Sequence, residues 1–539
     1  MPRPKDGVFR KSIARTSISY DTRLRCPTNA KVFLMKSILF LLLGLVSIAP
    51  QESMANANER PNIVLAISDD QSFPHASAYG CKGVSTPSFD EIAAAGVLFH
   101  NAYAGSPGCS PSRASLLTGR YPWQLEQAGT HASSFPSKYA VYPELLKQAG
   151  YWVGYTGKPW GPGNFKASGR TENPAGPGFN TKTEKSPFSG ISNKDYAGNF
   201  QDFLSKRPDG RPFCFWYGAH EPHRGFEYGA GLKSGKSLDD AEVPAFLPDH
   251  PVVQSDMLDY YLEIEHFDLH LGRIIQILKD AGEFENTLIV VTSDNGMAFP
   301  RAKANCFEYG IHVPMAISWP SVLEGNQQSE ALVSFVDLAP TFLQAAGLDI
   351  HPQMTGISLI GHMQGAALER DAVYSSRERH SSSRYMNWTY PQRAMRSGDY
   401  LLIHNFKPDR WPAGDPVKLN ADGSMGPAHG GYHDIDACPS LTFLIKSRHH
   451  RKWGPYLNWS VDKRGEWQLF NVKDDPECMR ELIKSPRVKR IRERMVADMN
   501  EFLKSTDDPR MYENGDVWES YIRYSRIRKF PMPPAQIPE

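Results

Sequence analysis

Two apolar segments that end in polar residues constrain the fold of this chain more than any other feature. The first, residues 61–68 (Pro-Asn-Ile-Val-Leu-Ala-Ile-Ser), runs into Asp69 and Asp70. The second, residues 287–293, repeats this design and runs into Asp294 and Asn295. Strands that are apolar throughout are buried on both faces, which is typical of parallel sheets covered by helices. The two segments therefore predict an α/β sheet with both polar ends at one edge.

Three carboxylates and one amide at these strand ends indicate a cation site. Oxygen ligands without histidine or cysteine favour a hard cation such as Ca²⁺ or Mg²⁺ over Zn²⁺. Paired aspartates after a strand are also common turn formers. The repetition of the pattern after the second strand favours metal ligands.

Between the two strands lies Cys109-Ser110-Pro111-Ser112-Arg113, which continues with small and apolar residues to Arg120. Ser110 is predicted to be the N-cap of a helix, with Pro111 at its first position. Cys109 would then lie at the positive end of the helix dipole, beside free backbone N–H groups. Arg113, one turn into the helix, could reach an oxyanion. The stretch predicts an anion site, and a structural cysteine before an ordinary helix is the alternative.

The stretch from 109 to 120 resembles the signature of the type I sulfatases, Cys-x-Pro-x-Arg followed by Thr-Gly-Arg. This resemblance implies that a formylglycine-generating enzyme converts Cys109 to formylglycine, an aldehyde whose hydrate is the nucleophile. It also implies a Ca²⁺ site formed by five positions: Asp69, Asp70, Cys109, Asp294 and Asn295.

Three further segments resemble family elements that surround the sulfate. Desulfation needs cations around a tetrahedral anion and an acid for the leaving group. Lys158 matches the family's substrate lysine, and Lys303 matches its second sulfate-binding cation. His220, which follows a buried apolar run, is expected to be the general acid or leaving-group contact. The resemblance thus implies a catalytic set: Cys109, Arg113, Lys158, His220 and Lys303.

Trp160 departs from the family pattern, because this position usually holds a histidine. The change removes one candidate hydrogen bond to the aldehyde hydrate or to the leaving group. We expect the indole to form a wall of the sugar pocket instead, since an aromatic face suits a pyranose.

Several segments resemble the heparan N-sulfatase branch of the family. They include Phe299-Pro300, the run from His220 to Arg224, and Ser375 to His380. The resemblance implies that the substrate is the N-sulfate of glucosamine in heparan-type glycans. The expected substrate contacts, in addition to Trp160, are His223, Arg224, Glu378, Arg379 and His380. An exposed charged loop is the alternative for the last three.

Three other functions remain open from the sequence. An O-sulfatase acting on another sulfated polysaccharide would use the same core machinery. A phosphonate or phosphodiester hydrolase belongs to the same superfamily, but its two-zinc members need histidine and aspartate ligands that are not found at these strand ends. A non-catalytic sugar-binding homologue is favoured only by Trp160.

The resemblance implies an alkaline-phosphatase-like α/β fold, with a mostly parallel sheet sandwiched by helices, over residues 58–372. A smaller α+β domain is expected over residues 373–539, because 393–403 and 467–471 have the pattern of strands in an antiparallel sheet. The clearest predicted helix, Met257 to Leu278, has one apolar face. A length of 539 residues agrees with two domains.

The N-terminal 57 residues predict a targeting segment. A short apolar run at 38–46 follows Met35-Lys36, and small residues at 54–57 suit cleavage. These features predict a secretory signal peptide, hence export to a periplasmic, extracellular or lysosome-like compartment. The run is too short for a stable membrane span, although an uncleaved anchor is the alternative. Seven sparse cysteines do not predict a disulfide framework, but one bridge is open.

Charge composition constrains the partners. The chain has 60 basic and 59 acidic residues, a net charge of +1. This balance argues against nucleic acid as a partner, while a local basic pocket could still bind a polyanion. We expect a sulfated glycan and the formylglycine-generating enzyme as partners, and a homodimer is left open.

Overall fold

The main sheet of the computed structural model, which describes residues 60–536, is mostly parallel. Its strands are β1 (Asn62–Ser68), β2 (Gly96–Tyr103), β3 (Trp152–Gly157), β4 (Phe213–Gly218), β5 (Thr287–Ser293), β6 (His312–Ser318), β7 (Gln327–Ser329) and β8 (Val333–Ser334). Their order is β3-β4-β1-β5-β6-β2-β7, and β8 pairs with β2. Only β6 runs antiparallel to its neighbours β5 and β2. The predicted mostly parallel sheet is confirmed.

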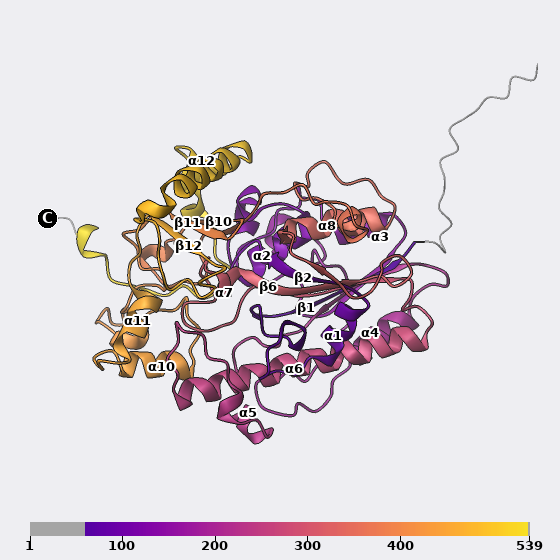
Figure 1. Ribbon diagram of the computed structural model, residues 1–539, viewed down its shortest axis with the longest axis horizontal. Coiled ribbons are helices and arrows are strands. Elements are labelled where there is room, and N and C mark those ends of the chain that lie inside the picture. The colour runs from indigo at the N-terminus through magenta and orange to yellow at the C-terminus, as the bar shows by residue number, and fades with distance from the viewer. Residues whose placement is uncertain (1–59, 537–539) are drawn as a thin grey trace, which may run out of the picture. The chain divides into compact units, whose positions relative to one another are not determined.

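Helices cover both faces of this sheet (Figure 1). The helices on one face are α2 (Cys109–Thr118), α3 (Tyr142–Gln148) and α8 (Leu338–Ala345), and those on the other are α1 (Pro87–Ala94), α4 (Tyr196–Ser205) and α6 (Pro251–Asp280). Side chains of β1 alternate between the two layers. Ile63, Leu65 and Ile67 pack with the first group, and Val64 and Ala66 pack with the second. This two-sided burial explains why β1 is apolar throughout.

Helix α6 is longer than predicted, because it begins six residues earlier and ends two residues later. At its start, Pro251 occupies a first-turn position, where a missing N–H costs nothing. His250 caps it, since its Nδ1 accepts a hydrogen bond from the Val252 N–H (3.2 Å). The predicted apolar face is confirmed by Phe267 and Leu271, which are buried against the sheet.

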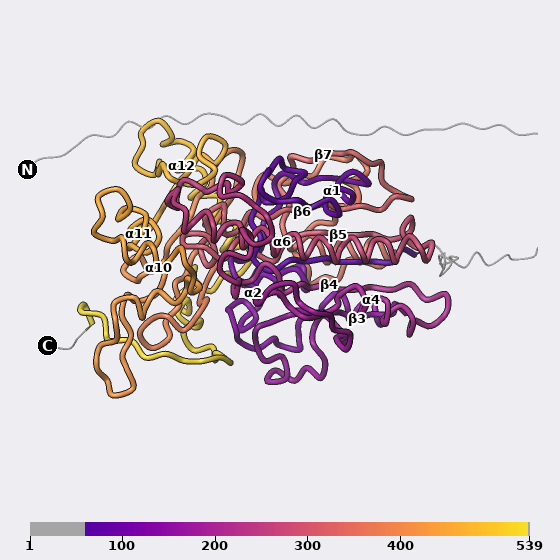
Figure 2. Tube along the Cα trace, turned by 90° about the horizontal axis from the view of Figure 1, so that it is seen from below, coloured from indigo at the N-terminus to yellow at the C-terminus, as the bar shows by residue number. Residues whose placement is uncertain are grey.

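A second sheet is antiparallel, as predicted from residues 393–403 and 467–471. Its strands are β9 (Ala372–Arg377), β10 (Gln392–Ser397), β11 (Tyr400–Asn405) and β12 (Trp467–Asn471), in the order β12-β11-β10-β9. One face packs against α12 (Lys489–Ser505) through Met495 and Met499. The other face packs against Ile311 of α7 (Glu308–Ile311) and its neighbours. Figure 2 shows this part of the chain beside the main sheet. The remaining helices are α5 (Ala230–Lys233), α9 (Ile360–Met363), α10 (Pro439–Lys446) and α11 (Gly454–Val461).

Residues 60–536 lie within one compact unit. The predicted boundary between 372 and 373 therefore stays a prediction, although β9 begins there. Within the described range, no helix combines the length and apolar character needed to cross a membrane. The six cysteines of that range are buried and unpaired. The predicted signal peptide and Cys26 lie outside the described residues.

Candidate active site

Four parallel strands bring the expected site residues to one edge of the main sheet. Ser68 of β1 lies opposite Ser293 of β5, and Gly157 of β3 lies opposite Gly218 of β4. Since β1 also pairs with β4 in parallel, all four strands end at the same level. The residues that follow them, including Asp69, Lys158, His220 and Asp294, therefore emerge side by side.

Carboxylates from β1 and β5 form a buried cluster around Cys109. Ligand atoms of Asp69, Asp70, Cys109 and Asp294 all lie within 4.8 Å of one another. Asp70 has a left-handed backbone (φ 78°), which aspartate tolerates better than most residues. Its N–H donates to Asp294 Oδ1 (3.1 Å), and its Oδ1 accepts from Asn295 Nδ2 (2.7 Å). The two hydrogen bonds thus hold the strand ends together, and they keep Asp70 in its left-handed conformation.

The donor set fits a hard cation. Three carboxylates converge, and the buried Oδ1 of Asn295 has no hydrogen-bond partner among residues 60–536. Such oxygen donors are the ligands that Ca²⁺ prefers. The soft Cys109 thiol is the exception, and an oxygen-bearing derivative at this position would suit the cation better. The expected ligand set is therefore chemically consistent once Cys109 is converted.

Three cations face the three carboxylates. Lys158 pairs with Asp69, Lys303 Nζ lies 2.6 Å from Asp70 Oδ2, and Arg113 Nε lies 2.7 Å from Asp294 Oδ2. The side chains of Arg113 and Lys303 are buried, and that of Lys158 is 13% exposed. Each of these three carboxylates thus has one cationic partner. A divalent cation among the carboxylates would leave the cluster positive, which suits an anionic substrate.

The pKa values of the cluster follow from burial and these pairs. Burial opposes ionisation of Asp69, but Lys158 and the neighbouring cations outweigh it and hold its pKa well below the usual range. Burial raises the pKa of Asp294 to about 6 against the influence of Arg113. Burial also raises the pKa of the Cys109 thiol well above its usual value. An unconverted Cys109 is thus a thiol at neutral pH and a poor nucleophile.

Helix α2 begins one residue before the predicted N-cap. Gly108 is the N-cap, and its carbonyl accepts the Ser112 N–H (3.2 Å). The expected cap, Ser110, lies inside the helix, and its Oγ accepts the Ala132 N–H (3.1 Å) instead. A Cβ at Gly108 would lie 2.9 Å from His380 Nδ1, so a larger residue there would displace the imidazole. Cys109 therefore occupies the first helical position, at the positive end of the dipole.

Two histidines follow β4. The backbone N–H of His220 donates to the Tyr196 hydroxyl (3.0 Å), which fixes the chain. Burial lowers the pKa of His220 to about 4, although Asp69 opposes this shift. His223 Nε2 lies 3.9 Å from Asp70 Oδ2, and its side chain is 38% exposed. His220 thus lies on the Asp69 side of the cluster, and His223 is an accessible group on the Asp70 side.

Trp160 was expected to form a wall of the sugar pocket, but its side chain is buried in the core. Its side chain is 2% exposed and belongs to the core between the main sheet and α2. The indole Nε1–H donates to the carbonyl of Ser110 (3.1 Å), and the ring packs edge-to-face on Phe135. The large apolar ring is buried in the core beneath α2, and its N–H bonds the backbone of that helix. The tryptophan therefore supports the helix that carries Cys109.

Two of the expected sugar contacts, Glu378 and Arg224, form internal ion pairs, and a third, Arg379, donates to a backbone carbonyl. The carboxylate of Glu378 forms ion pairs with Arg393 (2.9 Å) and Arg510 (2.7 Å). Arg379 is buried and donates to the carbonyl of Tyr521 (2.9 Å). Arg224 makes a two-pronged ion pair with Asp256 and stacks between Phe226 and Phe299. These charges are buried, and buried charges require partners, so the geometry differs from the expected free contacts. His380 lies near the start of α2, where a Cβ on Gly108 would come within 2.9 Å of its Nδ1.

Asp436 belongs to the site but was not predicted from the sequence. Its Oδ2 lies 3.1 Å from Lys303 Nζ, and it can share a metal with Asp70 and His223. Burial opposes its ionisation, but Lys303 and His223 outweigh this effect and hold its pKa well below the usual range. No motif surrounds Asp436, so only tertiary contact identifies it.

Comparisons with known proteins agree with this geometry. The sulfatase family model matches residues 61–348, and the model described as the C-terminal part of N-sulphoglucosamine sulphohydrolase matches residues 302–420. Human N-sulphoglucosamine sulphohydrolase is 28% identical over 503 residues, covering 87% of this chain and 93% of the relative. An ulvan-active sulfatase of Formosa agariphila is 25% identical, covering 84% and 76%. A solved structure described as a complex with its substrate D-glucosamine-2-N,6-O-disulfate has a TM-score of 0.59 at 20% identity and covers 83% of this chain and 98% of its own.

Proposed function

Because this chain belongs to the sulfatase family, we propose that it is an exported enzyme that removes the N-sulfate of glucosamine from heparan-type glycans. The family assignment establishes a sulfatase enzyme and a sulfated substrate. The N-sulfate is favoured by the human relative, which aligns over 87% of this chain, and by the second family model.

One observation carries the sulfatase chemistry. Arg113, Lys158 and Lys303 converge on the same buried carboxylates as Cys109. In a site largely excluded from water, these cations hold and neutralise the oxygens of a sulfate more strongly than they would at the surface. When the substrate binds, each cation weakens its ion pair with a carboxylate and contacts the sulfate instead. The three together orient the sulfur toward position 109.

Two groups that the family implies complete the site. Formylglycine at position 109, formed by a generating enzyme, would supply an aldehyde hydrate as the oxygen nucleophile. Ca²⁺ held by Asp69, Asp70, Asp294, Asn295 and position 109 would supply positive charge against a sulfate oxygen. The high pKa of the Cys109 thiol supports the need for conversion, because the thiol itself would not attack.

His220 assists the leaving group. At pH 7 it is neutral, since burial lowers its pKa to about 4. It donates a hydrogen bond to the leaving nitrogen, and the negative charge of a bound sulfate raises its pKa toward the range of a proton donor. The accessible His223 lies at the same strand end and contacts the sugar.

A second candidate is an O-sulfatase that acts on another polysaccharide. It is favoured by the ulvan-active relative, which aligns over 84% of this chain. The sulfate-binding cations would act in the same way, and only the sugar contacts would differ.

The test is mass spectrometry of heparan-derived oligosaccharides after incubation with protein whose Cys109 conversion has been confirmed by peptide mapping. Two matched substrates are compared, one with a terminal N-sulfated glucosamine and one with only a 6-O-sulfate. Loss of the N-sulfate alone supports the proposal, and loss of the O-sulfate alone contradicts the N-sulfate assignment. Cys109→Ala, which cannot be converted, is the control and should release nothing.

A further inference from the structure

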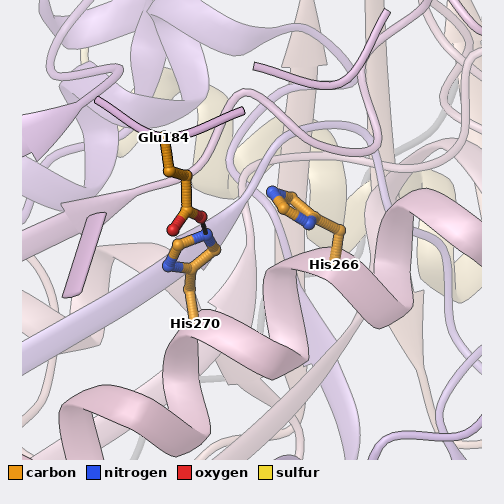
Figure 3. Close-up of side chains that lie close together, drawn as sticks. All are labelled: Glu184, His266 and His270. Atoms are coloured by element: carbon orange, nitrogen blue, oxygen red, sulfur yellow. Dashed lines mark ion pairs between the residues drawn. The ribbon is translucent and has the colours of Figure 1, made fainter. Parts of the chain in front are cut away.

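Glu184, His266 and His270 form a cluster of metal-binding side chains that the desulfation chemistry does not use (Figure 3). One ligand atom from each lies within 4.8 Å of the others. The histidines are four residues apart on α6 and therefore share one face of the helix. Glu184 comes from the segment between β3 and α4. Figure 3 shows the two rings and the carboxylate around a common space.

The two imidazoles are buried, and the Nε2 atom of each lacks a hydrogen bond. His270 is fully buried and His266 is 8% exposed. The Nε2 atoms of both have no hydrogen-bond partner within residues 60–536. His270 Nε2 lies 2.9 Å from Glu184 Oε1, a close approach without the alignment of a hydrogen bond. Buried unpartnered nitrogens are costly, and a metal ion would satisfy both.

The carboxylate is held in place by neighbouring groups. Arg273 Nη1 donates to Glu184 Oε2 (3.1 Å), and Arg273 Nη2 donates to Asp195 (2.8 Å). The backbone N–H of Glu184 donates to the carbonyl of Asn193 (2.8 Å). Oε2 is therefore occupied, while Oε1 faces His270. Such outer contacts are typical of metal ligands that are oriented before the metal binds.

We propose that Glu184, His266 and His270 bind a divalent cation of the zinc class. Two imidazoles and one carboxylate are a common ligand set for Zn²⁺ and a poor one for Ca²⁺. Zinc–ligand bonds of about 2.0–2.2 Å place tetrahedral ligand atoms roughly 3.3 Å apart. Because the three ligand atoms already lie within 4.8 Å of one another, small side-chain movements suffice to bind the metal. Glu184 is partly exposed, which leaves room for water as the fourth ligand.

Binding requires one rearrangement. With the metal on Nε2, the ring proton of His270 occupies Nδ1, which lies 3.4 Å from Arg273 Nη1. Two donors would then face each other. Arg273 gives up this contact and keeps its two carboxylate partners.

The metal would stabilise the segment that leads into α4. This segment also holds the residue after His220, since the Ser192 N–H (2.7 Å) and the Tyr196 hydroxyl (2.8 Å) both donate to Glu221. Binding to the folded state alone raises stability with the logarithm of metal concentration. Stabilisation of this segment is the effect expected of the metal, and the site is separate from the Ca²⁺ ligands proposed above.

The experiment is a calorimetric titration of the full-length protein with Zn²⁺, after chelation and with Ca²⁺ kept in large excess. We expect one equivalent to bind, and we expect His266→Gln and Glu184→Gln each to weaken binding at least tenfold. His449→Gln, which removes an exposed histidine elsewhere, is the matched control and should bind as wild type does. Circular dichroism without zinc establishes that each variant is folded.

Two measurements distinguish this site from the cluster at Cys109. Co²⁺ bound by nitrogen and oxygen gives visible bands without the near-ultraviolet charge-transfer band of a thiolate ligand. Zn²⁺ should raise the melting temperature of the wild type and leave that of His266→Gln unchanged. The proposal is overturned if no zinc binds, if a thiolate band appears, or if both folded cluster variants bind zinc like the wild type.

Discussion

Replacing Trp160 by phenylalanine separates a structural role of this residue from a role in binding sugar. The indole is buried, and its Nε1–H donates to the carbonyl of Ser110 in α2 (3.1 Å). Phenylalanine removes the donor and part of the ring. The lost hydrogen bond costs roughly 1 kcal/mol, and the unfilled ring volume costs roughly another 1 kcal/mol. We expect unfolding to become easier by about 2 kcal/mol.

The assay is urea denaturation, paired with steady-state kinetics on the substrate that the protein cleaves. The KM of Trp160→Phe should stay within about threefold of wild type, because the ring does not line an open surface. A small decrease in kcat is expected, because Ser110 follows the nucleophile position. Trp459→Phe, at a partly exposed tryptophan, should change stability by less than about 0.5 kcal/mol.

The opposite pattern would refute this reasoning. If Trp160→Phe unfolds like the wild type and its KM rises tenfold or more, the indole contacts the sugar and the buried position is incorrect.

Three further predictions concern charge and metal. Lys303→Ala should lower kcat by about 10²–10³-fold, because a buried cation next to the substrate anion is lost. Sulfate release measures kcat, and circular dichroism establishes that the variant is folded. A decrease of less than threefold would contradict the role of Lys303. Burial lowers the pKa values of His75 and His380 to about 3, so the unfolded state binds more protons between pH 6.5 and pH 3. The contribution of these histidines to the free energy of unfolding should therefore be fully present above pH 6.5. Below that pH it should fall by up to about 1.4 kcal/mol per pH unit for each histidine. Urea midpoints at pH 7.5 and pH 5 measure this decrease, and equal midpoints would argue against it. Chelation should abolish sulfate release, and added Ca²⁺ should restore it while Zn²⁺ should not, because Asp69, Asp70 and Asp294 offer carboxylate oxygens. Full activity in a chelator would exclude an essential metal.

Local patterns predicted the elements that carry the site. The continuous apolar run at 287–293 coincides with β5, and that at 61–68 begins one residue before β1. Strands buried on both faces leave no polar alternation, so their limits are sharp in the sequence. The parallel pairing of β1 with β5 then follows from their shared design, and with it the meeting of Asp69 and Asp294.

Helix limits were predicted less well, because they depend on capping contacts. Ser110 is a residue type that favours the N-cap, but the extended residue before the helix is Gly108, and Ser110 bonds the Ala132 N–H instead. The earlier start of α6, six residues before the predicted one, depends on the cap formed by His250.

The sequence by itself determined the buried strands and the aspartates that follow them, because these depend on the apolar pattern along short segments. The placement of Lys158 and Lys303 around Cys109 was implied by the resemblance to the sulfatases. Only the tertiary structure decided which charges are free. It pairs Glu378 with Arg510, 132 residues away, and brings Asp436 to Lys303, 133 residues away. A buried charge must find a partner wherever the fold supplies one, and no local pattern records that choice.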